Sequence, residues 1–501
     1  MLKRTHQCGG SALLNVIFCL ILTCGCKVGP DYMPPEYGPP LNWLGASTDG
    51  VTQGPADIRH WWTVFDDPML EKLIGAAETG NLDVQEAYAR IMEARDVVGF
   101  ASGEYWPNVD AVGFYERARV SENGLLVPVA GSPDQTNLHS LGLDAIWELD
   151  VFGRISRSVE SATASLGASV EDYRDILVSL YADVAANYID IRALQARIRY
   201  ARANVEAQRS SVELTRDRFD AGLVPQLDVQ QAELNLATTE SKIPALRQLE
   251  SQAIYRASVL LGLPPAALID SLSPPSEIPV PPSEVTAYLP AELMRQRPDI
   301  RRAERLLAAQ VADIGTATAD LYPIFSLSGI FALEAQQIND LGNWGSRTWS
   351  FGPAFRWNLF DGNRIRSNIR IQQAQAEQAL IRYEQTVLLA LEEVEDAMVA
   401  LAEERQRLDA LQRSVNAAER SVELVITLYR NGLTDFQNVL DSQRSLATQQ
   451  DQLAQSAGQL SKNLVALYRA LGGGWNLDEP DLTPNAGDYN IERAATNDIQ
   501  K

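Results

Sequence analysis

The sequence has very little cysteine: all four cysteines lie within the first 26 of its 501 residues. Cleavage of an export signal before Cys26 would leave one thiol, which cannot form an internal disulfide. Histidine is also rare, with only His60 and His139 beyond residue 25, and no glycine-rich phosphate loop followed by lysine is present. These absences argue against a catalytic centre, and we predict that the protein is not an enzyme.

Long apolar runs are missing as well. The run at residues 12–22 follows Lys3 and Arg4 and is too short to span a bilayer. We therefore predict that residues 1–25 are a signal peptide. No later segment reaches the roughly 18 consecutive apolar residues of a membrane-spanning helix. If the chain enters a membrane again, it must do so as β-strands.

Cys26 ends the stretch LTCGC, which resembles a bacterial lipobox with Thr23 at the position where leucine is usual. We expect diacylglycerol and palmitate on Cys26. Lys27 follows the cysteine, where the inner-membrane retention signal of such lipoproteins would place Asp, so we expect delivery to the outer membrane. The alternative is ordinary signal cleavage with an incidental cysteine.

Basic residues are outnumbered, with 43 Lys and Arg against 65 Asp and Glu, for a net charge of −22. Such a chain repels nucleic acid and anionic lipid surfaces, so we expect no nucleic-acid partner. Six scattered methionines show no relay for a soft metal ion, and we expect no metal site.

The chain resembles itself at two offsets, 216 residues before one loop of the repeat and 210 residues after it. The segment DVQEA at 83–87 is similar to DIRRA at 299–303, and beyond a shorter loop Trp147 and Gly222 match Trp357 and Gly432 at an offset of 210 residues. One shift of register at one loop indicates a duplicated unit. The predicted domains are a signal at 1–25, a lipidated extended segment at 26–65, repeat 1 at 66–262, a Pro-rich linker at 263–288, repeat 2 at 289–471 and a polar tail at 472–501.

Each repeat contains two segments with apolar and polar residues in alternation, which predict strands at about 108–120, 138–149, 324–334 and 348–360. A half-buried soluble sheet has the same period. With an export signal and strands of about 10 residues, however, a transmembrane barrel is favoured. Four strands cannot close a barrel and lipid permits no open edges, so several chains must share one.

The rest of each repeat is helical in pattern. Residues 153–220 and 362–430 each predict a rod on the order of 100 Å long. Shorter helices are expected at 68–102, 227–261, 291–319 and 436–471. A long soluble coiled coil, as in a structural periplasmic lipoprotein, would explain the helices but neither the strands nor the duplication. The predicted fold class is mainly α with a transmembrane β part, in two tandem repeats.

Four segments carry a specific resemblance: KVGPDYMPPEY, WELDVFGRISRSVESA, YRNGLTDFQNVLDSQRSL and LYRALGGGW. They look like the TolC-type outer-membrane efflux factors, closest to the lipoprotein branch of OprM-like and NodT-like channels, from Cys26 to about Trp475. The resemblance implies a homotrimer with four strands per chain in a shared 12-stranded β-barrel. It also implies a long α-helical barrel in the periplasm, which docks onto a periplasmic adaptor protein and an inner-membrane pump, most often of the RND type.

By this resemblance the protein is a passive exit duct for drugs or other small compounds. Polypeptide secretion and metal-ion efflux are alternatives that the sequence does not separate from it. In the family, the turns between paired helices meet the adaptor, and the matching residues here are Gly222, Leu223, Gly432 and Leu433.

The resemblance also implies a gate at these turns. Tyr429 matches a latch tyrosine, and Asp228 matches its acidic partner on a neighbouring helix, to which the phenol would donate a charge-assisted hydrogen bond. Asp441 matches a ring aspartate at the constriction, with Arg444 as a candidate counter-ion one helical turn away. The alternative for this last pair is a solvated ion pair on a helix surface.

Overall fold

The computed structural model describes residues 27–35, 38, 43, 51–53, 58–119, 121, 135–282, 285–287, 292–293 and 296–475. Cys26 and its predicted lipid lie outside these residues. The chain divides into two compact units, and each predicted repeat contributes to both. Unit 1 comprises residues 1–36, 90–169 and 302–384, and unit 2 comprises 37–89, 170–301 and 385–501.

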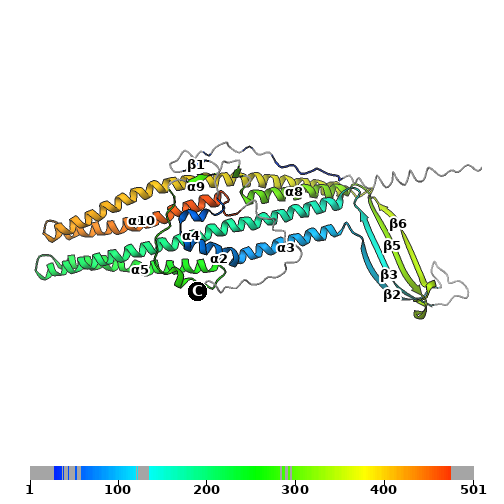
Figure 1. The fold of residues 1–501 in the computed structure, drawn as a ribbon, viewed down its shortest axis with the longest axis horizontal. Helices are drawn as coiled ribbons and strands as arrows, with labels where there is room; N and C mark the ends of the chain where they lie inside the picture. Colours follow the sequence, from blue (N-terminus) through cyan, green and yellow to red (C-terminus); the bar gives the residue numbers. More distant parts are fainter. Residues whose placement is uncertain are drawn as a thin grey trace, which may run out of the picture. The chain divides into compact units, whose positions relative to one another are not determined.

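Unit 1 contains one antiparallel sheet, in the order β2-β3-β5-β6 (Figure 1). Its register places Ala111, Leu143, Phe331 and Trp349 side by side on successive strands. The strands are β2 (Asn108–Arg119), β3 (Gln135–Leu149), β5 (Ile324–Ala335) and β6 (Arg347–Arg356). Strand β6 ends four residues before the expected 360, because its partner β5 begins at Ile324, immediately after a proline. The sheet joins parts of both repeats.

Helices lead to and from this sheet in unit 1. They are the later part of α3 (Leu82–Gly103), the first part of α4 (Arg154–Asp220), α8 (Pro298–Ala319) and the first part of α9 (Arg364–Arg430). The loop between β5 and β6 contains two short 3-10 turns, η3 (Ile338–Asp340) and η4 (Trp344–Ser346).

Unit 2 contains the remaining parts of α4 and α9 and their hairpin partners. In Figure 1, α5 (Gln226–Leu260) runs beside α4, and α10 (Phe436–Ala470) runs beside α9. Smaller elements complete the unit: η2 (Trp61–Phe65), α2 (Pro68–Gly80), α6 (Ile269–Leu272) and the parallel pair β1 (Val51–Gln53) and β4 (Val285–Ala287). No helix in the described part of the chain is long and apolar enough to cross a membrane.

The two 67-residue helices begin in the same way. The carboxylate of Asp150 accepts a hydrogen bond from the backbone N–H of Ile155 at 2.9 Å, and the carboxylate of Asp361 accepts one from Ile365 at 2.6 Å. Each carboxylate satisfies a backbone donor that the first helical turn leaves without a partner. The same sequence signal therefore starts both rods.

A tryptophan repeats its contact in both copies. The indole N–H of Trp147 donates to the carbonyl of Tyr105 at 2.9 Å, and that of Trp357 donates to the carbonyl of Leu321 at 3.0 Å. The tryptophans differ by 210 residues and their acceptors by 216, the two offsets found in the sequence. The duplicated segments thus make equivalent tertiary contacts.

The expected single helix over 68–102 is wrong at one point. Helix α2 ends at Gly80 and α3 begins at Leu82. Between them, the side-chain oxygen of Asn81 accepts from the backbone N–H of Asp83 at 2.8 Å, and its amide donates to the carbonyl of Leu260 at 2.8 Å. Asn81 therefore caps a new helix and ties it to the end of α5.

Candidate functional site in the strands and at the helix tips

One face of the four-stranded sheet is apolar and aromatic. The register aligns the odd-numbered residues of all four strands on this face. Its large side chains are exposed in the single chain, at 50% for Phe331, 66% for Trp349, 77% for Phe351 and 68% for Phe355. An exposed apolar surface that runs across a whole sheet requires a cover, and lipid is a solvent that suits it.

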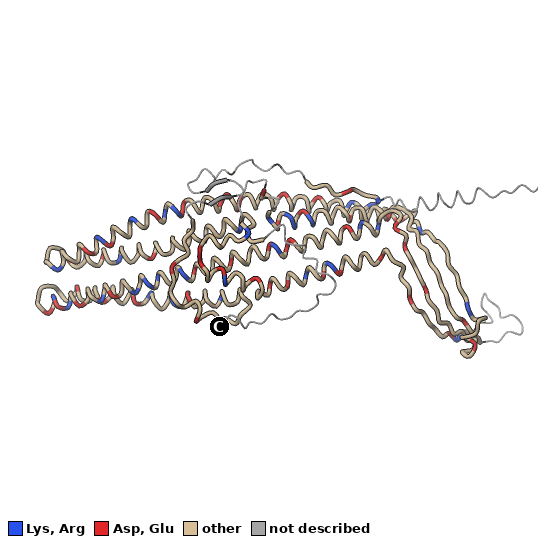
Figure 2. Tube along the Cα trace, in the orientation of Figure 1, with Lys and Arg blue, Asp and Glu red and all other residues tan. Residues whose placement is uncertain are grey.

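Charge is distributed differently on the strands and the helices. Figure 2 shows acidic and basic residues at many positions along the long helices and at few positions in the β5–β6 hairpin. Within that hairpin, β5 carries only Glu334, and β6 carries charges only at its two end residues. The opposite face of the sheet, made by even-numbered residues, places Asp110 directly across from Asp144. The sheet therefore has one face suited to lipid and one suited to water.

The sheet has two edges. Among the described residues, β2 pairs only with β3, and β6 pairs only with β5. Backbone N–H and C=O groups along these edges have no ladder partner, which hydrocarbon does not tolerate. A sheet of this kind in a membrane must be completed by strands of other chains.

The two helix tips share one backbone geometry. Gly222 and Gly432 have φ of 73° and 72°, which is the left-handed conformation that ends a helix. The backbone N–H of Leu223 and of Leu433 each bonds five residues back, to the carbonyls of Arg218 and Leu428, at 2.9 Å. Both leucine side chains project into solvent, 66% and 72% exposed. Each predicted tip thus presents a leucine next to a residue without a side chain.

Arg218 is a tip residue that the sequence analysis missed. Its guanidinium donates to the carbonyls of Tyr429 and Arg430, both at 2.9 Å, and lies 4.8 Å from the centre of the Tyr429 ring. These carbonyls belong to the last turn of α9, where a cation offsets the helix dipole. Arg218 therefore joins the two hairpins. No local pattern could reveal it, because its partners lie more than 200 residues away.

Tyr429 belongs to an apolar cluster between the hairpins. The buried members of this cluster are Val212, Ala232, Val425, Tyr429, Phe436, Val439 and Leu440. The Tyr429 ring packs against Phe436 at a centroid distance of 5.3 Å and is 2% exposed. Its burial raises the pKa of the phenol.

The hydrogen bond predicted between Tyr429 and Asp228 is not formed within the chain. The Tyr429 hydroxyl is buried and makes no hydrogen bond to any described residue. Asp228 lies in the first turn of α5, where burial and then the charge of Asp435 raise its carboxyl pKa above the ordinary value of 3.8. The charge of Asp228 also acts on the Tyr429 phenol and raises its pKa. The two residues interact electrostatically without bonding.

The predicted ion pair between Asp441 and Arg444 is also not formed. Asp441 accepts from the side-chain amide of Gln437 at 3.0 Å, and Arg444 donates to the side-chain oxygen of Asn235 at 3.2 Å. Arg444 therefore reaches across to α5 rather than along its own helix. Both residues are exposed, and Asp441 remains available to solvent.

A line of polar contacts connects α4 to the second hairpin. The α4 residues are spaced by seven, which keeps them on one side of a helix in a coiled coil. Three of the contacts reach α10, at 2.7, 2.8 and 2.7 Å: Arg197 with Asp451, Asn204 with Gln450 and Ser211 with Gln443. The fourth residue in this series is Arg218, with its bonds to α9. Hydrogen bonds, as well as apolar packing, therefore hold the two hairpins together.

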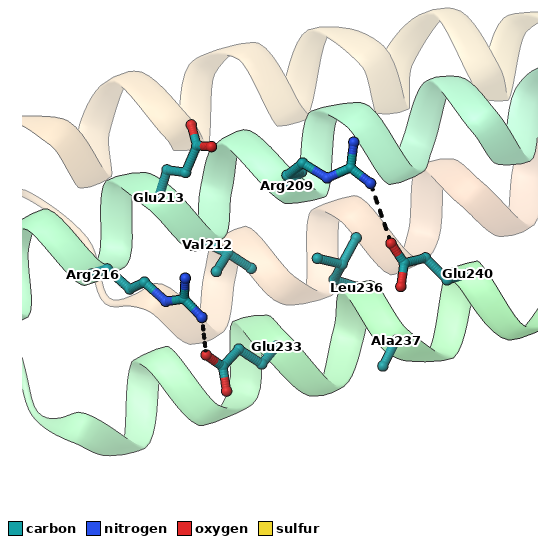
Figure 3. A pocket seen from close by; sticks show the side chains of 8 residues that line it. All are labelled: Arg209, Val212, Glu213, Arg216, Glu233, Leu236, Ala237 and Glu240. Carbon is teal, nitrogen blue, oxygen red and sulfur yellow. Dashed lines mark hydrogen bonds and ion pairs between the residues drawn. The ribbon is translucent and has the colours of Figure 1, made fainter.

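The first hairpin has ion pairs on its outer surface. A surface hollow of about 350 Å³ lies between α4 and α5. Two ion pairs cross it, Arg209–Glu240 at 3.3 Å and Arg216–Glu233 at 2.5 Å (Figure 3). All four side chains are substantially exposed, so each pair contributes little to stability. Within the described residues, no three His, Cys, Asp or Glu side chains gather as metal ligands would.

Comparison with known proteins adds to this geometry. The family described as outer membrane efflux protein matches residues 73–262 and 289–473, which correspond to the two repeats. The nodulation protein T of Rhizobium leguminosarum bv. trifolii is 33% identical over 461 residues, covering 92% of this chain and 97% of the relative. The outer membrane protein OprJ of Pseudomonas aeruginosa is 30% identical over 476 residues, covering 94% and 97%.

A solved structure agrees with the sequence relatives. The outer-membrane channel OprN matches with a TM-score of 0.85 at 36% identity, covering 90% of this chain and 100% of that chain. The likeness includes both the strands and the helices, because it extends over nearly the whole described chain.

Proposed function

This chain belongs to the outer membrane efflux protein family and is an exit duct of a tripartite efflux pump, and we propose that it works as a homotrimer that conducts small compounds passively. The family is one of channels, and we propose no catalytic role. Drugs and similar small molecules are the proposed cargo, by analogy with relatives such as the antibiotic efflux pump outer membrane protein ArpC of Pseudomonas putida.

The open edges of the sheet carry the proposal of a trimer. Four strands per chain leave β2 and β6 each with one unpaired side among the described residues. If β6 of one chain pairs with β2 of the next, three chains close a barrel of twelve strands, and every backbone group finds a partner. The aromatic face then meets lipid, and the face with Asp110 and Asp144 lines a water-filled lumen.

The helix tips are the proposed docking points for the periplasmic adaptor. The positive φ of Gly222 and Gly432 and the exposed leucines beside them support this role, since a partner helix can approach without meeting a side chain at the glycine. The proposed pump in the inner membrane is of the RND type. The helices would then lie in the periplasm.

A gate at the tips is part of the proposal. Asp228 and Asp435 carry like charges near one another, and Asp441 is exposed. Carboxylates brought together from three chains would repel unless a cation or a proton joins them. Tyr429, buried beneath Arg218, is proposed to hold α9 in the closed position.

The lipid on Cys26 is also a proposal. Metabolic labelling with a palmitate analogue should mark the mature wild-type protein, and Cys26→Ala should remove the label. An unlabelled wild type would refute the anchor and leave the channel proposal untouched.

The decisive test of function is a bulky residue at a tip. Gly432→Trp should leave trimers intact but abolish both crosslinking to the adaptor and drug resistance, because the indole blocks the approaching helix. A control for bulk alone is Gly342→Trp in the β5–β6 loop, where a Cβ atom would meet nothing within 4 Å, whereas at Gly432 it would lie 3.8 Å from the Arg218 guanidinium. Wild-type resistance in Gly432→Trp would exclude docking at this tip.

A further inference from the structure

The first described residues are held in place by several contacts. The backbone N–H of Val28 donates to the carbonyl of Phe152 at 3.2 Å, and the Lys27 ammonium lies 3.7 Å from Glu160. Phe152 lies in the short connection between β3 and α4. All of these residues belong to unit 1, so this is a local arrangement within one compact part of the chain.

Arg157 is the centre of this arrangement. Its side chain is 2% exposed, and its guanidinium donates to the carboxylates of Asp31 at 2.7 Å and Glu160 at 2.9 Å. It also donates to the backbone carbonyls of Val28 at 3.2 Å and Gly29 at 3.4 Å. Three of these four acceptors belong to the N-terminal segment: the Asp31 carboxylate and the carbonyls of Val28 and Gly29. If that segment left, Arg157 would exchange three hydrogen bonds for contacts with water, and a hydrogen bond to a charged group is among the stronger ones in a protein.

Glycines make the close approach possible. A Cβ atom on Gly29 would lie 2.5 Å from the Cα of Gly315, and one on Gly315 would lie 2.7 Å from the side chain of Arg157. A Cβ atom on Gly153 would lie 2.9 Å from the Cα of Lys27. Gly29 and Gly153 also have positive φ, 88° and 79°. Backbone therefore packs against backbone at two positions, Gly29 on Gly315 and Gly153 on Lys27, and Gly315 also leaves room for the Arg157 side chain.

A second anchor follows a few residues later. The Tyr32 hydroxyl donates to the Glu304 carboxylate of α8 at 3.2 Å, and burial raises the pKa of this phenol. The segment thus contacts α4 of repeat 1 and α8 of repeat 2. The position equivalent to Arg157 in repeat 2 is Ser367, which has no guanidinium to offer. Repeat 2 therefore has no counterpart of Arg157 at this position.

We propose that Arg157, Gly153 and Gly315 form a docking groove for residues 27–32 that holds the acylated end of the chain beside the β3–α4 connection. The proposal rests on the proposed lipidation of Cys26, which immediately precedes Lys27. Its consequence is that the acyl chains and the strands reach the membrane at a fixed spacing. Residues 27–32 are then a packed part of unit 1 and not a flexible linker.

Trypsin offers a direct test, because Lys27 is followed by no other Lys or Arg before Arg59. Cleavage after Lys27 in the mature detergent-purified protein would release a lipidated dipeptide. We expect the wild type to resist cleavage at this bond, because a protease needs an undocked, extended segment. Arg157→Met should be cleaved at least about tenfold faster, the change expected from the loss of one hydrogen bond to a charged group.

Two further variants ensure that the test does not depend on whether Arg157→Met folds correctly. Gly315→Ala should also accelerate cleavage, since its new Cβ atom displaces Arg157. Arg370→Met is the matched control: this exposed arginine donates to the hydroxyl of Ser367, and its loss should change nothing at Lys27. The tryptic pattern elsewhere in the chain reports whether each variant is folded.

Two readouts separate the groove from the lipid. The mass of the large fragment reports cleavage at Lys27 whether or not a lipid is present, and the palmitate label reports acylation. Rapid cleavage of the wild type, or equal resistance in wild type and Arg157→Met, would overturn the groove. An unlabelled wild type with a protected Lys27 would refute lipidation alone.

Discussion

The hairpins that end at Gly222 and Gly432 have the same backbone but bury different side chains. Phe219 in the first is 40% exposed, whereas its equivalent Tyr429 in the second is 2% exposed. Arg218 reaches from the first hairpin onto the second, while its equivalent is Leu428, 43% exposed. The duplicated fold therefore does not give duplicated contacts.

The same asymmetry extends along the helices. The ion pairs Arg209–Glu240 and Arg216–Glu233 hold α4 to α5 on the surface. In repeat 2, Glu419 and Gln450 stand at the positions of Arg209 and Glu240, and Glu419 accepts a hydrogen bond from Gln450. Ile426 and Gln443 stand at the positions of Arg216 and Glu233. Gln443 is buried and donates to Ser211 of the first hairpin. The first hairpin is thus linked within itself at its surface, and the second is secured by contacts to the first.

The largest effect is expected at Arg218. Arg218→Met should lower the free energy of local unfolding at residues 429–433 by about 2 kcal/mol, because two carbonyls lose a charged donor and the Tyr429 ring loses its cation. Hydrogen exchange of these amides measures the change. Leu428→Met, at the equivalent position, is the control and should have almost no effect. Equal effects of the two substitutions would contradict the conclusion that Arg218, unlike Leu428, links the two hairpins.

A somewhat smaller effect is expected at Gln443. Gln443→Leu should destabilise the contact between α4 and α10 by about 1 to 2 kcal/mol, since the side chain is buried and the Ser211 hydroxyl loses a hydrogen-bond partner. Thermal unfolding and exchange on α10 report it. Glu233→Leu, at the matching position of repeat 1, should cost less than about 0.5 kcal/mol. A larger loss of stability in Glu233→Leu than in Gln443→Leu would contradict the conclusion that the second hairpin depends more on its contacts to the first.

The ion pairs between α4 and α5 should make the stability of the first hairpin depend on salt. Glu233→Gln should weaken the first hairpin by about 0.5 kcal/mol at low ionic strength and by nearly nothing in concentrated salt, because exposed charges are screened. Exchange on α5 measured in both conditions tests this. The same loss at high salt would show that the pair acts through packing and not through charge.

The smallest effect concerns pH at the first tip. Because the folded-state pKa of Asp228 is raised, the folded tip binds this proton more tightly than the unfolded chain does. The tip should therefore be more stable in acid and lose that stability as pH rises through the raised pKa. Exchange at the start of α5, corrected for intrinsic rates, should show this trend in the wild type and a flatter one in Asp228→Asn. An opposite slope would contradict the burial of this carboxyl.

Sequence alone predicted the long elements well. The rods expected at 153–220 and 362–430 lie at Arg154–Asp220 and Arg364–Arg430. They were predictable because each is an uninterrupted run of helix-forming residues that stops just before a glycine. Sequence alone missed the break at Asn81, although Gly80 followed by Asn81 is a turn and capping signal that could have revealed it.

The details of the tips could not be predicted. Spacing along α10 suggested that Arg444 faces Asp441, but Asn235 on another helix supplies the acceptor. Likewise, Tyr429 and Asp228 interact without the expected bond, because the phenol is enclosed by the apolar cluster. The hydrogen-bond partner of a polar side chain at the tips can lie about 200 positions away in the sequence. The spacing of residues along one helix gives no information about such a partner.

In the proposed trimer, β2 of one chain pairs with β6 of the next, and this pairing closes one barrel. Replacing Phe114 on β2 with photoreactive benzoylphenylalanine tests it in the native membrane, with Ile330, on the same face of the interior strand β5, as the control position. After irradiation and denaturation, position 114 should give linked species of two and three chains and none larger, with the linked peptide from residues 347–356, whereas position 330 should give products within one chain. Products confined to single chains at position 114, or a ladder that continues beyond three, would contradict the shared barrel.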